Sequence, residues 1–177
     1  MLDAFKAVKK NRGAAGIDKQ SIQMFEANLE QNLEALMRAL KTGTYDPLPL
    51  KRVEIPKGNG KFRSLGIPVV KCRVGQAVLS LLLNPIFDKL FHESSHGFRV
   101  KRSCHTAITE LLAYFKQGYN VVVEADIKGF FDNILQELIM AMCKRAIEDG
   151  NILRVCHKIS DASLLVLLPI SCVALDG

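Results

Sequence analysis

An aspartate at the end of a β-prone run is the residue with the clearest chemical potential. Asp126 follows residues 121–125 (VVVEA) and precedes residues 127–131 (IKGFF). The β-branched run predicts a strand over residues 119–126, with this carboxylate at its carboxyl end. A carboxylate there can hold a divalent metal, with the carbonyl oxygen of Ile127 as a second ligand, and paired metals of this kind catalyse phosphoryl transfer. Alternatively, the same side chain caps the helix that follows.

A basic, glycine-rich turn is the second candidate. Residues 51–56 (KRVEIP) and 62–68 (FRSLGIP) flank the segment KGNGK, and this arrangement predicts a β-hairpin. Lys57, Lys61 and Arg63 then lie on or next to its tip. There Arg offers a planar fork of donors and Lys a mobile charge, which suits a triphosphate. The alternative is an ordinary exposed hairpin whose charges discourage pairing with other strands.

The net charge of +6 is unevenly distributed along the 177 residues. Residues 51–105 carry 11 basic and 3 acidic side chains, a net charge of +8, whereas residues 106–177 carry 6 basic and 9 acidic ones. Such a concentration of positive charge favours a polyanionic partner, nucleic acid or nucleotide phosphates. A solubilising surface is the alternative interpretation.

Several protein classes are disfavoured by composition. The five cysteines are odd in number and form no C-x-x-C pair, which argues against a disulfide framework and a zinc site. The longest apolar run, residues 164–170, is far shorter than the ~20 residues of a membrane span, and the opening residues lack a signal-peptide pattern. We therefore expect a protein of the cytoplasm, bacterial or organellar matrix, with no membrane partner.

Helices must position these candidates. Apolar spacing predicts helices over residues 1–10, 19–41, 70–92, 103–118 and 134–149, with Ser103 capping the fourth. Together with the hairpin and the strand ending at Asp126, they indicate an α+β fold.

Four blocks, taken together, resemble the reverse transcriptases of group II introns. They are residues 11–18 (NRGAAGID), 55–68 (IPKGNGKFRSLGIP), 95–99 (SHGFR) with Arg102-Ser103, and 125–132 (ADIKGFFD). Their order and spacing match over about residues 1–155. The resemblance implies a fingers region of helices and hairpin over residues 1–115 and an incomplete palm over residues 116–158. Residues 159–177 leave the family pattern, as a truncated or frame-shifted reading would.

The resemblance also implies roles for individual residues. Asp126 would be catalytic and, with the carbonyl of Ile127, would bind Mg²⁺. The nucleotide-binding residues would be Lys57, Lys61, Arg63, Phe98, Arg99 and Phe131, the last of which would block a ribonucleotide 2′-hydroxyl. The nucleic-acid contacts would be Lys51, Arg52, Lys71, Arg73, Lys101 and Arg102. The implied partners are intron and template RNA, a DNA primer and deoxynucleoside triphosphates. Separately, the apolar faces of the incomplete palm need cover, which either residues 164–170 folding back or a homodimer would provide.

Departures from the family pattern shape the functional expectation. Cys72 and Gly75 stand where the family usually has Asp and Gln, and the Pro-Gln-Gly block and Tyr-x-Asp-Asp pair are absent. We expect the N-terminal part of an RNA-directed DNA polymerase that assists intron splicing, with the isolated chain inactive as a polymerase. A non-catalytic RNA-binding maturase fragment is the alternative. A palm-type nucleotidyl cyclase lacks support, because no Gly-Gly-Asp/Glu-Glu-Phe turn is present.

Overall fold

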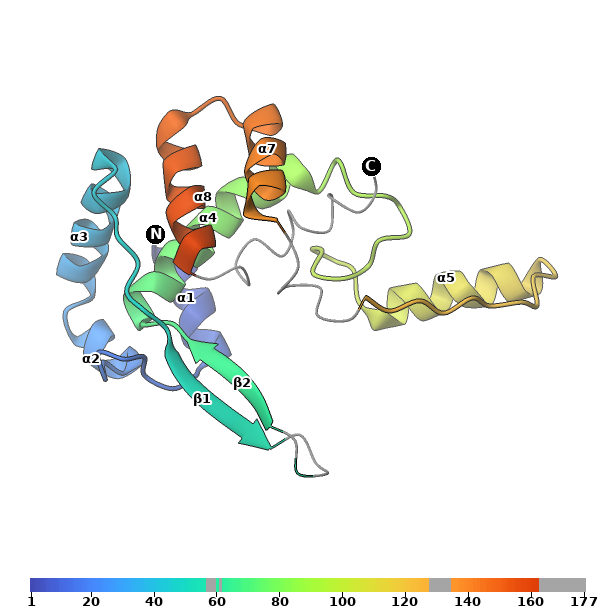
Figure 1. Ribbon diagram of the computed structural model, residues 1–177, viewed down its shortest axis with the longest axis horizontal. Coiled ribbons are helices and arrows are strands. Elements are labelled where there is room, and N and C mark those ends of the chain that lie inside the picture. The colour runs from blue at the N-terminus through green and yellow to red at the C-terminus, as the bar shows by residue number, and fades with distance from the viewer. Residues whose placement is uncertain (57–59, 61, 128–134, 163–177) are drawn as a thin grey trace.

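The computed structural model describes residues 1–56, 60, 62–127 and 135–162. Helices dominate this part of the chain, accompanied by one antiparallel two-stranded sheet, so the α+β class is confirmed (Figure 1). The elements in chain order are α1 (Leu2–Asn11), α2 (Ile22–Ala27), α3 (Leu29–Thr42), β1 (Lys51–Pro56), β2 (Phe62–Ile67), α4 (Val70–Phe87), α5 (Cys104–Lys116), α7 (Gln136–Ala146) and α8 (Gly150–Ala162).

Helix α4 lies at the centre of the core. Val70, Val74 and Leu83 are almost completely buried, and helices α1, α3 and α8 pack against this helix (Figure 1). Pro85 lies within α4, and the helix continues to Phe87, with the Asp88 amide donating to the carbonyl of Asn84. The predicted helix over residues 70–92 therefore ends earlier than its apolar spacing suggested, and residues 88–90 form a turn.

The loop after α1 approaches the start of α4 very closely. A Cβ atom added at Gly16 would lie 2.6 Å from the Cα of Val69, and one at Gly13, where φ is +116°, would lie 2.7 Å from Nη1 of Arg73. Arg73 itself donates to the carbonyl oxygens of Arg12 and Ala14, at 3.3 and 2.7 Å. The glycines of this loop are therefore required by packing against α4.

The predicted helix over residues 19–41 is two helices. Asn28 separates α2 from α3 with φ −123° and ψ 45°, outside the helical region. The side-chain amide of Asn32 donates to the carbonyl of Phe25 at 2.9 Å, which satisfies an acceptor that the break would leave open. Phe25 and Leu36 face the same core on the two sides of this break.

The predicted hairpin is confirmed between residues 51–56 and 62–67. Lys51 pairs with Ile67 and Pro56 with Phe62 in an antiparallel register, and the hairpin projects from the helical body (Figure 1). Its residues are mostly exposed, with only Val53 on β1 half-buried. Leu65, Gly66 and Ile67 at the base of β2 are half-buried, so the exposed part of the hairpin is the end that points away from the helices.

The strand predicted over residues 119–126 is wrong for this structure. The segment is extended and exposed but pairs with no strand among the described residues, and it runs beside helix α5 (Figure 1). Residues 121–123 border a shallow depression with Leu111, Tyr114 and Phe115 of α5. A β-branched run becomes a strand only when a neighbour supplies the backbone hydrogen bonds, and none is described here.

Helices α7 and α8 form an antiparallel pair on the core (Figure 1). The former confirms the helix predicted near residues 134–149, with residue 134 outside the described part; the latter was not predicted. The amine of Lys158 donates to the Tyr45 carbonyl at 2.7 Å, and Ile159 is completely buried. Helix α8 thus docks on the segment after α3 and continues through Ala162. Residues 163–177 lie outside the described residues.

Among the helices that the structure describes, none combines the length and apolarity needed to cross a bilayer.

We predict that Gly16→Ala destabilises the fold by about 2 kcal/mol or more, because its new methyl group would overlap the backbone of Val69. Urea unfolding measures the effect. Gly150→Ala is the matched control, since nothing lies within 4 Å of its added Cβ, and it should change stability by less than about 0.5 kcal/mol. Equal stability of the two variants would contradict the close approach.

Candidate nucleic-acid interface

The loop after α4 is organised around the guanidinium of Arg99. Its Nε donates to Oδ1 of Asp88 at 2.8 Å and its Nη2 to the Asp88 carbonyl at 3.2 Å. Its Nη1 donates to the carbonyl oxygens of His92 and Ser95, at 2.9 and 3.2 Å. The guanidinium also lies 5.3 Å from the ring centroid of Phe91, within cation–π range. Only 9% of the Arg99 side chain is exposed, so its donors serve the loop itself.

The other side of this loop is tied to helix α5. His96 Nε2 lies 2.8 Å from Oε2 of Glu110, and His96 Nδ1 lies 2.9 Å from Oγ1 of Thr106. Ser94 donates to Oε1 of Glu110 at 2.6 Å. The Ser94 hydrogen bond, followed by that of His96, holds the pKa of Glu110 below its ordinary value of 4.5. Thr106 also closes the capping box with Ser103 that begins α5, which confirms the predicted cap.

Two residues of this loop have left-handed backbone conformations. Phe98 has φ 56° and Lys101 has φ 63°, in a region that bulky residues rarely occupy. Phe98 is 71% exposed and Lys101 is also exposed. Arg102 donates to the Glu93 carbonyl. The loop therefore presents an aromatic ring and a cation outward, while the two arginines are engaged within it.

Only part of the predicted hairpin site is described. Lys51 and Arg52 are exposed on β1. Lys57 and Lys61 lie outside the described residues, as does the side chain of Arg63. The backbone of Arg63, in β2, pairs with Ile55 of β1. The structure thus places β2, which carries Arg63, directly after the region of the expected tip.

The two basic residues at the start of α4 differ in availability. Lys71 is exposed. Arg73 donates inward to the loop of residues 12–14, and its burial lowers the pKa of its guanidinium. The exposed Lys71 is accessible to a phosphate, whereas Arg73 stabilises the loop of residues 12–14 through its hydrogen bonds.

Asp126 and Ile127 lie at the exposed end of the extended segment. The described residues contain no cluster of three or more His, Cys, Asp or Glu side chains able to hold a metal. Phe131 lies outside the described residues. Oxygen ligands suit Mg²⁺ chemically, but one carboxylate and one carbonyl fall short of the octahedral set that this ion takes. The donor set described is therefore incomplete.

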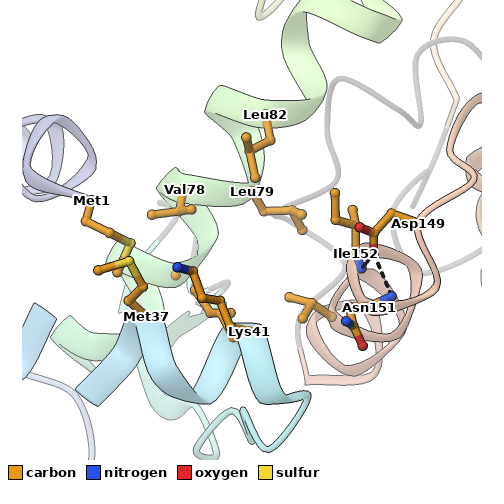
Figure 2. A pocket seen from close by; sticks show the side chains of 12 residues that line it. Met1, Met37, Lys41, Val78, Leu79, Leu82, Asp149, Asn151 and Ile152 are labelled. Carbon is orange, nitrogen blue, oxygen red and sulfur yellow. Dashed lines mark hydrogen bonds between the residues drawn. The ribbon is translucent and has the colours of Figure 1, made fainter. Parts of the chain in front are cut away.

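An apolar pocket of about 370 Å³ lies elsewhere, between α1, α3, α4 and α8 (Figure 2). Met1, Met37 and Val78 face one part of it, and Asp149 and Asn151 lie at the start of α8. Asp149 accepts hydrogen bonds from the amides of Asn151 and Ile152, at 2.8 and 3.0 Å, so it serves the first turn of that helix. None of the predicted site residues lines this pocket.

The comparisons with known proteins connect these elements to a family. The model of the reverse transcriptase (RNA-dependent DNA polymerase) family matches residues 55–160, from the end of β1 into α8. The chain belongs to the reverse transcriptase family. Its similarity to group II intron-encoded and intron maturase proteins places it with the group II intron reverse transcriptases and maturases.

Individual relatives agree with this assignment. Protein YkfC of Escherichia coli is 34% identical over 89% of this chain and 43% of its own length. The group II intron-encoded protein LtrA of Lactococcus lactis is 34% identical over 92% of this chain and 27% of its own length. The putative COX1/OXI3 intron 1 protein of Saccharomyces cerevisiae is 36% identical over 75% of this chain and 16% of its own length. The reverse transcriptase chain therefore spans less than half the length of these relatives.

Sequence patterns singled out Arg99 but not the residues that bind it and His96 in the 92–102 loop. Asp88, Ser94, Thr106 and Glu110 were not predicted, because each lies in an ordinary local pattern. The spacing of Thr106 and Glu110 on one face of α5 is the only available signal, since residues four apart in a helix are neighbours.

We predict that acid weakens this part of the fold. The pKa values of Glu110 and Asp88 both lie below their ordinary values of 4.5 and 3.8, the latter mainly through the hydrogen bond from Arg99. Their stabilising contribution is complete above those ordinary values and is lost as the pH falls through the lowered folded-state pKa values. Melting temperature measured against pH should fall less steeply for the Glu110→Gln, Asp88→Asn double variant. Identical pH slopes for both proteins would contradict the two interactions.

Proposed function

We propose that this chain is the N-terminal part of an RNA-directed DNA polymerase that copies RNA into DNA and assists the splicing of a group II intron. The observation that carries the proposal is the family match over residues 55–160, together with relatives whose names denote intron-encoded proteins and an intron maturase. The activity would belong to the whole enzyme, of which this chain corresponds to a part. The chain covers 43% and 27% of the length of two of these relatives.

Within this function, residues 1–115 form the fingers and residues 116–158 begin the palm. The helical core with its projecting hairpin supports the first assignment. The extended, exposed segment of residues 119–127, which carries Asp126, supports the second.

The incoming deoxynucleoside triphosphate would be held between hairpin and loop. Lys61 and Arg63 would bind its phosphates, with Lys57 as an additional contact, and Phe131 would exclude the 2′-hydroxyl. The outward direction of the hairpin and the exposure of Phe98 support this arrangement. The inward hydrogen bonds of Arg99 make it the weakest of these candidates.

RNA would contact the exposed basic residues of the same region. Lys51, Arg52, Lys71 and Lys101 all lie on the surface, where ammonium and guanidinium groups can neutralise phosphates. Arg73 and Arg102, which donate to backbone carbonyls, would support loops beside that surface.

Asp126 and the carbonyl of Ile127 would contribute ligands to Mg²⁺ in the complete palm. Such an ion, when bound, supplies charge stabilisation for phosphoryl transfer. The residues described here would donate oxygen atoms to it, and further carboxylates would have to come from outside the described residues.

The remaining partners and the location follow from the same assignment. A DNA primer would complete the substrates, and the protein would work in the bacterial cytoplasm or an organellar matrix, in keeping with relatives from bacteria and mitochondria. A homodimer would cover apolar side chains of α5 such as Leu112 and Phe115, which are 52% and 44% exposed.

RNA binding gives the first test. Replacing Lys51, Arg52, Lys71 and Lys101 by Ala should weaken binding to single-stranded RNA and flatten the dependence of log K on log salt. Each lost phosphate contact should remove about 0.7 from the slope. Filter binding or fluorescence anisotropy over a salt series measures it.

The matched control removes four exposed cations from other elements, namely Lys6 and Lys10 of α1 and Lys144 and Arg145 of α7. Its slope should remain that of the unmodified protein. Equal loss in both variants would mean that the net charge, rather than this surface, attracts the RNA.

Primer extension gives the second test. We predict that a polypeptide of these 177 residues does not extend a DNA primer on an RNA template with Mg²⁺, because two-metal catalysis needs more carboxylates than Asp126. Template-dependent incorporation above the no-protein background, abolished by Asp126→Asn, would show that the chain holds a complete metal site.

A further inference from the structure

The 92–102 loop is fixed on two opposite sides by side chains that reach into it from its neighbours. From the end of α4, Asp88 receives the Nε of Arg99 at 2.8 Å, and the rest of that guanidinium binds three carbonyl oxygens. From α5, Glu110 binds both Ser94 and His96. The loop is therefore held at both of its flanks, although it contains no helix or strand.

The largely buried side chains of His96 and Arg99 point inward, whereas Phe98, which lies between them in sequence, is exposed. Only 12% of the His96 side chain and 9% of the Arg99 side chain are exposed, whereas 71% of Phe98 is exposed between them. Phe98 also has a left-handed backbone, with φ 56°. A bulky residue keeps that conformation only when its surroundings impose it.

The position of the Phe98 ring indicates the class of ligand that it would contact. Phe98 lies three residues from the exposed Lys101, within the segment of highest positive charge. Single-stranded nucleic acid is bound by cations that follow the phosphates and by aromatic rings on which bases stack. An exposed aromatic ring near an exposed cation, on a loop that is held from both sides, has this chemistry.

We propose that His96, Glu110, Asp88 and Arg99 are positioning residues that hold Phe98 as a stacking platform for one base of single-stranded nucleic acid. The proposal rests on the proposed function for its ligand, RNA. It gives Arg99 a supporting role rather than a direct contact with nucleotide. It also gives His96 a role that its place in the basic segment alone did not indicate.

The chain contains no tryptophan, which allows a direct measurement. Phe98→Trp introduces a single indole fluorophore at the proposed platform and keeps an aromatic ring there. Short single-stranded oligo(A) should quench this fluorescence on binding, because the bases stack on the indole. Heparin, a polyanion without bases, should bind without comparable quenching. Equal quenching by the two polymers would overturn the stacking role.

The positioning residues are then tested in the same background. His96→Ala and Glu110→Ala should each lower the fluorescence anisotropy of the introduced indole in the free protein and reduce its quenching at saturating oligo(A). The salt dependence of binding should stay unchanged, because the phosphate contacts remain. Glu110→Gln, which keeps one acceptor oxygen and adds an NH2 donor that a neutral His96 can accept, should retain most of the quenching.

A matched control removes a similar pair elsewhere. His157 lies 2.8 Å from Asp161 on α8, so His157→Ala deletes a histidine–carboxylate contact without touching the loop. It should leave both fluorescence signals unchanged. Circular dichroism verifies folding of every variant, and Glu110→Ala provides an independent test should His96→Ala fail to fold.

The possible results distinguish a failure of RNA binding from a failure of the positioning role. Absence of oligo(A) binding by the unmodified chain would overturn the RNA-binding function itself. Retained binding with full quenching in His96→Ala and Glu110→Ala would overturn the positioning role alone. Phe98→Ala should weaken oligo(A) binding about tenfold, within the range expected for one stacked base, and unchanged affinity would overturn the platform.

Discussion

The burial of helix α4 is the interaction on which the rest of the structure depends. Helices α1, α3 and α8 all pack against it, although they come from opposite ends of the described chain (Figure 1). The loop after α1 can reach it only because Gly16 leaves no side chain against Val69. Two loops then take their position from α4 and its end, the first through Arg73 and the second through Asp88.

The basic segment of residues 51–105 divides into two kinds of cation. Arg73, Arg99 and Arg102 donate to backbone carbonyls, a task for which the guanidinium has several fixed donors. Lys51, Arg52, Lys71 and Lys101 remain exposed. The three arginines that bind carbonyls thus shape loops beside the surface on which the exposed cations lie. A net charge of +8 in this segment therefore overstates the number of cations available to a ligand.

Helix α5 and the segment of residues 119–127 form the least covered part of the described chain. No side chain of α5 is buried, and Val121 and Val123 are 81% and 88% exposed. Exposed apolar surface of this kind marks a site of association in soluble proteins. Asp126 lies in the same region. A partner segment that covered this apolar surface would therefore also lie next to the proposed metal site.

The sequence by itself determined the hairpin, the cap at Ser103 and the reverse transcriptase family, because turn chemistry, capping and ordered motifs are properties of neighbouring residues. It misjudged residues 119–126, because a strand depends on hydrogen bonds from another segment. It did not single out helix α8, whose packing is seen only when Lys158 meets the Tyr45 carbonyl across the fold. Only the tertiary structure decided that Arg99 faces inward and Phe98 outward, since both follow from contacts with Asp88 and Glu110, which lie on the elements at either side of the loop.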